Sequence, residues 1–301
     1  MLTINNVLFF DSETTGVPER NAKWDEDFAD FPHVVQLAWM HGEKMESHII
    51  CPVGWEIPDD VVAVHGITTE YALEHGESFV LVIDKFIQDC HDAELLCAHN
   101  IYFDTSIIKA NIIRELGREY YDGNDVESAL HKGKRIDTMR PTMKWVDART
   151  ETNRLKFPRL EELYDRCFPG ETFPAHDALE DVKAVARCLP VLLENGLVEL
   201  KVKEYPEETG DVSKTIQKAA TSVDGLSKAA KIAAGAVTAF GDAASRAKEI
   251  AKASEKAENA PNFDAKQEND KSHIQPEQAQ NIENLGKISQ AEAELLDENE
   301  F

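Results

Sequence analysis

The order of the apolar segments limits this chain to a mixed α/β fold. Short runs of β-branched and aromatic residues predict strands at residues 6–11, 34–40, 45–51, 94–98 and 135–138. Helical spacing of apolar residues predicts helices near residues 78–90, 101–117, 159–167 and 178–194. Three early strands in succession, followed by alternating strands and helices, predict an antiparallel meander continued by parallel pairs. The expected fold class is therefore α/β, with a mixed five-stranded sheet flanked by helices.

The composition changes abruptly near residue 205 and divides the 301 residues into three parts. Residues 1–205 carry the α/β pattern. Residues 206–256 are rich in alanine and almost free of aromatic residues, which favours a helical extension. Residues 257–301 are polar and acidic and offer little material for a core. We therefore expect one folded domain, an Ala-rich helical extension and a disordered acidic tail.

Cysteine usage and charge restrict the class of protein. The five cysteines are odd in number and form no C-x-x-C pair, so the pattern favours neither a disulfide framework nor a zinc knuckle, and a cytoplasmic location is expected. No segment approaches the ~20 consecutive apolar residues that span a bilayer, so no membrane partner is expected. The net charge of -24 repels phosphate backbones at long range. A nucleic-acid ligand would therefore need metal ions for local attraction.

Two acids stand at the end of the first predicted strand, in the segment DSETTG. Asp11 and Glu13 are two residues apart, so on a strand both side chains project from the same face. Both carboxylates can then reach one metal ion from one edge of the sheet. The following Thr14, Thr15 and Gly16 offer hydroxyl groups and a flexible backbone that can approach a phosphate or a sugar.

Three further polar residues occupy two later segments, HNIYFD and HDALED. Asp104 lies near the start of a predicted helix, where a lone acid is explained equally well as a favourable N-terminal charge. Asp181 is expected on the last predicted helix, and His176 on the loop that leads into it. Because gathering four carboxylates raises the cost of ionising each one, such a set predicts a divalent cation that neutralises them.

Taken together, DSETTG, HNIYFD and HDALED resemble the three motifs of the DEDDh 3′-to-5′ exonucleases. This family has the ribonuclease H-like fold and includes the proofreading epsilon subunit of the bacterial replicative polymerase. Motif order, spacing and context all agree, as do the segments HGIT and RIDT, over about residues 5–195. The resemblance implies hydrolysis of phosphodiester bonds at single-stranded or frayed 3′ ends of DNA, with release of nucleoside 5′-monophosphates during proofreading or repair.

The resemblance also implies roles for the five motif residues. Asp11, Glu13 and Asp181 would hold one Mg²⁺ or Mn²⁺, and Asp11 would also reach a second ion that Asp104 supports through water. His176 would act as the general base, because a neutral imidazole can accept the proton of the attacking water. All five residues are thus candidate catalytic residues, and the four acids are candidate metal ligands.

Substrate contacts follow from the same resemblance. The backbone at Thr14 and Thr15 would hold the terminal 3′-OH, Val17 would wedge against the last base, and His65 would contact the terminal nucleotide. The candidate substrate-binding set is completed by Gly16, Asn100 and Phe103, of which Phe103 is also explained by packing alone. Side chains that wedge against a base or stack on it contact all four bases in a similar way, so little base specificity is expected.

The helical extension leaves its partner open. Apolar residues recur in it every seven positions, namely Val223, Ala230, Val237, Ala244 and Ala251. The favoured interpretation is a helix that docks on its own domain or on a second copy. An arm that follows nucleic acid or binds a DNA polymerase or another replication protein is the alternative. A membrane-surface helix is disfavoured because an alanine face buries little area.

Two rival functions also remain open. One is an RNA-trimming exonuclease of the same family, because the sequence does not reveal discrimination at the 2′-OH. The other is a non-catalytic replication adaptor that works through the extension. Loss of a motif carboxylate would favour the adaptor, and none of the four is missing.

Overall fold

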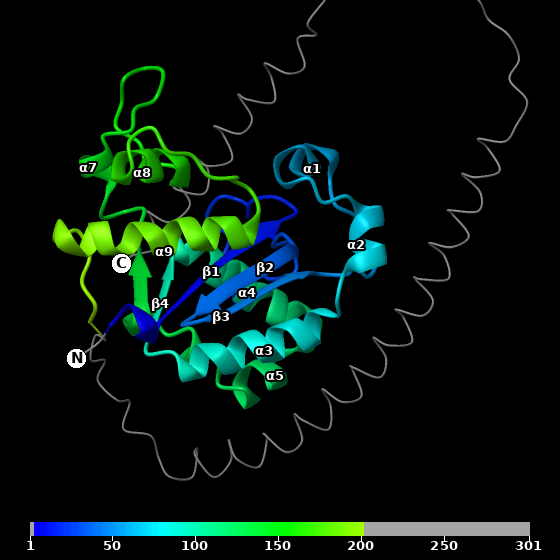
Figure 1. Ribbon diagram of the computed structural model, residues 1–301. Helices are drawn as coiled ribbons and strands as arrows, with labels where there is room; N and C mark the ends of the chain where they lie inside the picture. Colours follow the sequence, from blue (N-terminus) through cyan, green and yellow to red (C-terminus); the bar gives the residue numbers. More distant parts are fainter. Residues whose placement is uncertain (1–2, 202–301) are drawn as a thin grey trace, which may run out of the picture.

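The computed structural model describes residues 3–201, and within that range it contains a five-stranded mixed sheet (Figure 1). The strand order is β3-β2-β1-β4-β5. Neighbours are antiparallel from β3 to β1 and parallel from β1 to β5. The strands are β1 (Val7–Thr14), β2 (Val34–His41), β3 (Lys44–Ile49), β4 (Leu95–Ala98) and β5 (Arg135–Asp137). The predicted fold class and all five predicted strands are confirmed, whereas the predicted extension and acidic tail lie outside the described residues.

The four helices that were predicted between residues 3 and 201 are present. They are α3 (Phe79–Asp92), α4 (Ile101–Leu116), α8 (Leu160–Cys167) and α9 (Ala178–Glu194). The described part of the chain also contains five α-helices that were not predicted, namely α1 (Asp59–His65), α2 (Thr69–His75), α5 (Arg118–Gly123), α6 (Val126–Ala129) and α7 (Met143–Val146). Each of these spans two turns or fewer, and such short segments show no helical period in the sequence.

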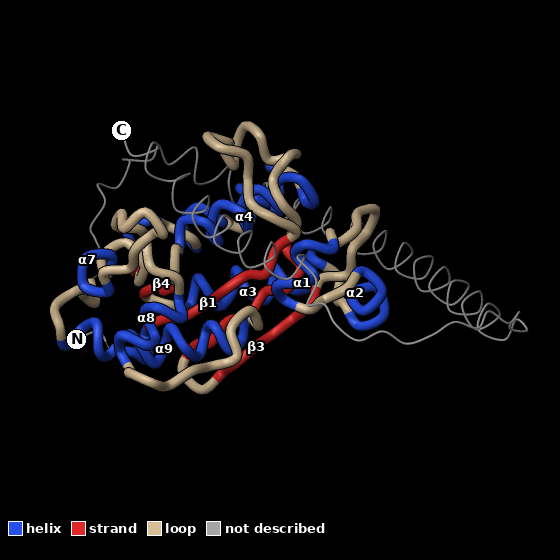
Figure 2. The backbone as a smooth tube through the Cα atoms, turned by 90° about the horizontal axis from the view of Figure 1, so that it is seen from above, coloured by secondary structure: helices blue, strands red, loops and turns tan. Residues whose placement is uncertain are grey.

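Strand β1 separates two cores because its side chains alternate between the faces of the sheet. Leu8 and Phe10 belong to the cluster that is built with α3 and α4. Val7 and Phe9 belong to the cluster that is built with α8 and α9. Figure 2 shows the strands running between α9 and α4. Asp11 and Glu13 continue the Val7 and Phe9 alternation, so they lie on the α9 side of the strand, as the spacing predicted.

The carboxyl end of β1 is shaped by an irregular pairing with β2. The register shifts between Glu13 and Thr14, so that Thr14 pairs with Val34. Beyond it, the Thr15 N–H donates to the His33 carbonyl at 2.9 Å, and the His33 N–H donates to Thr15 Oγ1 at 2.8 Å. A bulge of this kind bends a strand and redirects its side chains. It lies directly after the two acids of β1.

A strained turn joins β4 to α4. Asn100 precedes the helix with φ 66° and ψ 49°, the left-handed region that asparagine tolerates better than most residues. The Asp137 carboxylate at the end of β5 accepts hydrogen bonds from the N–H groups of Asn100, Met139 and Arg140 at 3.0, 3.0 and 3.2 Å. One carboxylate therefore fixes the start of α4 and the chain that leaves β5.

The start of α9 is equally well determined. Asp177 caps the helix, with its side chain accepting from the N–H groups of Leu179 and Glu180 at 3.0 and 3.2 Å. The Ala178 N–H donates to Gln36 Oε1 on β2 at 3.3 Å. These contacts hold the first turn of α9, which carries Asp181, against the sheet.

The cysteines and the helix lengths bear on two expectations, the absence of disulfides and the absence of a membrane span. All five cysteines are free thiols, and only Cys167 is not fully buried. Between residues 3 and 201, no helix combines the length and the apolar character that crossing a membrane requires.

Candidate active site

A cavity of about 170 Å³ opens at the carboxyl ends of β1 and β4. In open α/β sheets this edge is the usual place for ligands. Its walls come from β1, α1, the β4–α4 turn and the segment between β5 and α9. All five motif residues line it, namely Asp11, Glu13, Asp104, His176 and Asp181. The structure thus brings together residues that are up to 170 positions apart in the sequence.

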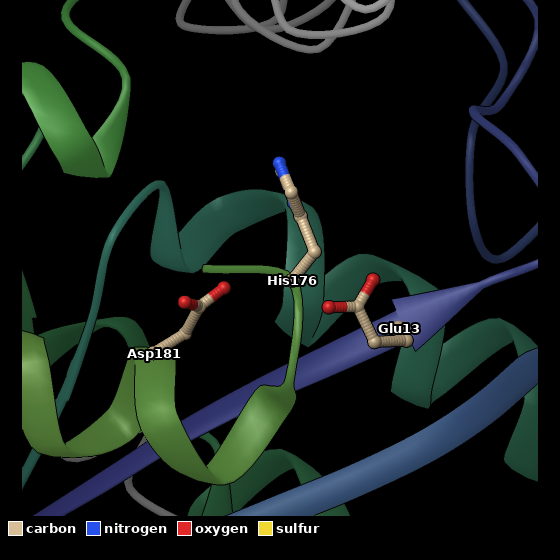
Figure 3. Close-up of side chains that lie close together, drawn as sticks. All are labelled: Glu13, His176 and Asp181. Carbon is tan, nitrogen blue, oxygen red and sulfur yellow. The ribbon is translucent and has the colours of Figure 1, made fainter. Parts of the chain in front are cut away.

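Three of these residues form a compact group. One potential ligand atom each from Glu13, His176 and Asp181 lies within 4.8 Å of the other two. Figure 3 shows the two carboxylates facing each other, Glu13 from β1 and Asp181 from α9, with the His176 side chain rising between them from its loop. The prediction that Asp181 is on the helix and His176 on the approaching loop is confirmed.

Asp181 is poorly stabilised as an anion by protein groups. Its Oδ1 atom is buried and accepts no hydrogen bond. Burial raises the pKa of Asp181 to about 8, and the negative charges of Glu13 and Glu161 act in the same direction. Asp181 therefore ionises only with difficulty beside the two other acids. A bound cation would restore its charged form.

Asp104 is held from the opposite face of β1. It is 3% exposed, and its Oδ1 accepts from Ser12 Oγ at 2.7 Å and from the Ser12 N–H at 3.1 Å. Burial raises the pKa of Asp104 to about 7, against the lowering effect of the Ser12 hydrogen bonds. Ser12 was not among the predicted site residues, although its place between Asp11 and Glu13 is the signal that it faces the other way.

The residues present fit a divalent metal centre. Carboxylate oxygens are hard ligands suited to Mg²⁺, Mn²⁺ or Ca²⁺. The buried free Oδ1 of Asp181 and the raised pKa values of Asp104 and Asp181 indicate a site that is incomplete without positive charge. The compact group of Glu13, Asp181 and His176 gives such an ion two acids and an imidazole within reach.

Glu161 is a further site residue that sequence reasoning missed. It lies in the first turn of α8, lines the cavity, and places Oε1 3.7 Å from His176 Nε2. Its neighbour Glu162 instead pairs with Lys156 at 2.9 Å. The helix itself was predicted. Whether Glu161 or Glu162 faces the cavity depends on how α8 is rotated about its axis, and packing rather than the sequence pattern sets that rotation.

Most predicted substrate contacts reach the cavity. Thr14, Gly16, His65, Asn100 and Phe103 line it. The cavity lining does not include Thr15, which pairs with His33, or Val17, which is half-buried beyond the bulge. These two contacts stay predictions that rest on the motif resemblance.

Two lining residues present polar atoms that suit a neutral ligand group. Asn100 is 5% exposed, and its Oδ1 is buried without a hydrogen-bond partner. Burial lowers the pKa of His65 to about 4, with His176 acting in the same direction, so the His65 ring is neutral at pH 7. A buried acceptor and a neutral imidazole can bind a sugar hydroxyl or a base edge.

A sequence model of the exonuclease family RNase_T matches residues 8–189. This match spans more than half of the chain and includes every motif described above. The chain belongs to this exonuclease family. The predicted relationship to the DEDD exonucleases, with their ribonuclease H-like fold, is confirmed by this match and by the topology of the sheet. A comparison with curated protein sequences finds no match.

Solved exonuclease I structures resemble the RNase_T domain at low identity. One is Escherichia coli exonuclease I in complex with a dA16 oligonucleotide, with 19% identity, a TM-score of 0.46, and coverage of 64% of this chain and 41% of that one. Another is exonuclease I from Methylocaldum szegediense, with 19% identity, a TM-score of 0.45, and coverage of 62% and 40%. The chain thus matches about two fifths of the length of each of these proteins.

Family membership gives the site its general chemistry. The family is one of exonucleases, enzymes that hydrolyse phosphodiester bonds, and the acidic cavity of this chain fits the divalent metal on which such hydrolysis commonly depends.

Proposed function

We propose that this protein is a 3′-to-5′ exonuclease that shortens single-stranded or frayed DNA ends and releases nucleoside 5′-monophosphates. The observation that carries the proposal is the meeting of Glu13, His176 and Asp181 within 4.8 Å. They meet in a cavity that Asp11 and Asp104 also line, within the matched exonuclease region.

The acids would hold two Mg²⁺ or Mn²⁺ ions. Asp11, Glu13 and Asp181 are the ligands proposed for the first ion, and Asp11 and Asp104 support the second. When bound, such ions polarise the scissile phosphate, lower the pKa of a coordinated water and neutralise the leaving oxygen. Ser12 fixes the orientation of Asp104 through two hydrogen bonds.

His176 would accept the proton of the attacking water. Its side chain is 40% exposed, so the imidazole can reach a water molecule in the cavity and pass its proton to bulk solvent. Glu161, 3.7 Å from Nε2, would stabilise the imidazolium that forms. His176 itself has a positive φ of 67°, a conformation that costs about 1 to 3 kcal/mol in a non-glycine residue.

The terminal nucleotide would lie between β1, α1 and α4. Thr14 and Gly16 would face its 3′ side, while His65, Asn100 and Phe103 would contact its sugar and base. An aromatic face and a few polar atoms recognise every base in a similar way, so this arrangement supports cleavage without sequence preference.

The test is degradation of end-labelled nucleic acid by the full-length protein with Mg²⁺ or Mn²⁺. A 5′-labelled strand should shorten stepwise, and a 3′-labelled strand should release labelled mononucleotide at once. Single-stranded DNA, mismatched duplex and RNA are compared side by side, and RNA as the preferred substrate would replace the DNA assignment by RNA trimming.

Two variants complete this test. Asp11→Asn should abolish the reaction, whereas Asp92→Asn, at an exposed acid at the end of α3, should leave it unchanged. Intact substrate with the wild-type protein, or equal rates for wild type and Asp11→Asn, would overturn the proposal and favour a non-catalytic adaptor.

A further inference from the structure

Residues 139–160, called the basic segment below, concentrate positive charge beside the acidic cavity. The chain as a whole has a net charge of -24. The basic segment instead has six cations against two acids, Asp147 and Glu151. The cations are Arg140, Lys144, Arg149, Arg154, Lys156 and Arg159. Both ends of the segment reach the site, because Met139, Pro158, Arg159 and Leu160 line the cavity.

Half of this positive charge is not neutralised by described residues. Arg149 pairs with Asp147, and Lys156 pairs with Glu162 at 2.9 Å. Lys144, Arg154 and Arg159 have exposed side chains and form no ion pair with any residue between 3 and 201. Exposed cations in excess of their protein partners attract phosphate groups.

Two aromatic rings lie beside one of these cations. The Arg140 guanidinium lies 5.3 Å from the centre of the Tyr102 ring and 5.7 Å from that of Phe157. Tyr102 precedes Phe103 in the chain and Phe157 precedes Pro158, and both Phe103 and Pro158 line the cavity. Partly exposed rings beside cations are the usual surface for single strands, since bases stack on the rings and phosphates contact the cations.

The basic segment is held in place by its own backbone contacts. Arg149 and Leu155 form a β-bridge, the Thr150 N–H donates to the Arg154 carbonyl at 2.8 Å, and the Arg154 N–H donates to Thr150 Oγ1 at 3.0 Å. The segment includes α7, which packs on α8, and α8 packs on α9 (Figure 1). The helix that carries Asp181 and the basic segment therefore belong to one packed unit.

We propose that the basic segment binds the phosphates of the nucleotides that precede the terminal one, and so forms the path along which the strand enters the site. This inference rests on the proposed function. The acid-lined cavity repels all but the phosphate that its metal ions neutralise, and the cations of the basic segment offset that repulsion for the rest of the strand. Efficient hydrolysis then depends on strand length, with several nucleotides needed for the lowest KM.

The test compares two substrates, a single strand of about twelve nucleotides and a dinucleotide, because only the first is long enough to reach past the cavity. The variant carries Lys144→Glu and Arg154→Glu in the full-length protein. It should raise the KM for the long strand about tenfold and change the KM for the dinucleotide less than twofold. The slope of log(kcat/KM) against log salt for the long strand should become shallower by roughly 1.4, or about 0.7 for each lost phosphate contact.

Matched variants separate charge from folding. Lys85→Glu with Arg118→Glu reverses two exposed charges on α3 and α5, away from the cavity, and should change neither KM. The exchange Lys144→Arg with Arg154→Lys keeps the charge and should keep the dependence on length. If the glutamate pair lowers the melting temperature, the Lys144→Gln and Arg154→Gln pair replaces it in the same comparison.

The outcomes distinguish this inference from the function on which it rests. Wild-type protein that hydrolyses neither substrate overturns the proposed function and this inference with it. Wild-type protein that hydrolyses both, with a dependence on length that charge reversal leaves intact, overturns the basic segment as the strand path while the exonuclease proposal stands.

Discussion

Ser12 and Asp104 are joined across the end of β1 by two hydrogen bonds to one oxygen. Asp104 Oδ1 accepts from Ser12 Oγ at 2.7 Å and from the Ser12 N–H at 3.1 Å. Ser12 lies between Asp11 and Glu13 but on the opposite face of the strand, so β1 positions acids on both faces at once. A single strand thereby determines where three of the four site carboxylates lie.

Ser12→Ala should impair the reaction without abolishing it. The variant removes the Oγ donor but leaves the backbone donor, and a hydrogen bond to a charged group contributes about 1.5 to 3 kcal/mol. We expect kcat/KM to fall about tenfold to a hundredfold, whereas Asp104→Asn should reduce it to background. Steady-state assays on a single strand measure both. Ser128→Ala, at an exposed serine on α6, is the control, and an unchanged rate for Ser12→Ala would contradict the positioning role.

Asp181→Asn should stabilise the protein when no metal is bound. The pKa of Asp181 is about 8 in the folded state and about 4 in the unfolded state, so between these values the folded state binds more protons. The stability of metal-free protein should therefore fall as pH rises from about 4 to about 8. The asparagine side chain carries no charge, so we expect the variant to be about 1 to 2 kcal/mol more stable than wild type at pH 8 in the presence of a chelator.

Thermal melts with and without Mn²⁺ give the complementary result. Metal should raise the melting temperature of the wild-type protein, because it neutralises the acids around Asp181, and should raise that of Asp181→Asn much less. Asp92→Asn is the control and should respond to metal as wild type does. Equal metal responses in all three proteins would show that Asp181 is not a ligand.

The sequence is informative where one local rule decides the geometry. Alternation along β1 was enough to place Asp11 and Glu13 on one face, and helical spacing placed Asp181 on α9. Ser12 was not predicted because its role depends on α4 packing on the opposite face of the sheet. That packing is a feature of the tertiary structure and leaves no local pattern in the sequence. Glu161 escaped because the packing of α8 on α9, rather than its own sequence, turns it and not Glu162 toward His176.

Replacing His33 should make stability less sensitive to acid. Arg114 Nη2 donates to His33 Nδ1 at 2.7 Å, and the ring stacks on Trp55 with centres 4.4 Å apart. Burial and the Arg114 charge lower the pKa of His33 to about 4, against about 6.5 in the unfolded chain. As pH falls from about 6.5 to about 4, the unfolded state therefore takes up a proton that the folded state refuses, and stability is lost in that window.

Urea unfolding at several pH values between about 4 and about 7 measures this effect. The loss of stability over this range should be smaller in His33→Gln than in wild type by about 1 to 2 kcal/mol. His91→Gln, at an exposed histidine on α3, is the control and should follow the wild-type curve. The same acid sensitivity in His33→Gln as in wild type would assign the effect to other groups, of which His65 is the first to examine because its pKa is also lowered to about 4.

Replacing His176 should lower kcat much more than replacing Glu161. His176→Gln removes the proton acceptor, and we expect kcat to fall by about 10² to 10⁴ while the metal-induced rise in melting temperature persists. Glu161→Gln keeps the acceptor and removes only the charge 3.7 Å from Nε2, so we expect a loss of about tenfold in kcat with little change in KM. Glu70→Gln, at an exposed glutamate on α2, is the control. If His176→Gln also loses its response to metal, the imidazole belongs among the metal ligands, as its place beside Glu13 and Asp181 allows, and another group must take the proton.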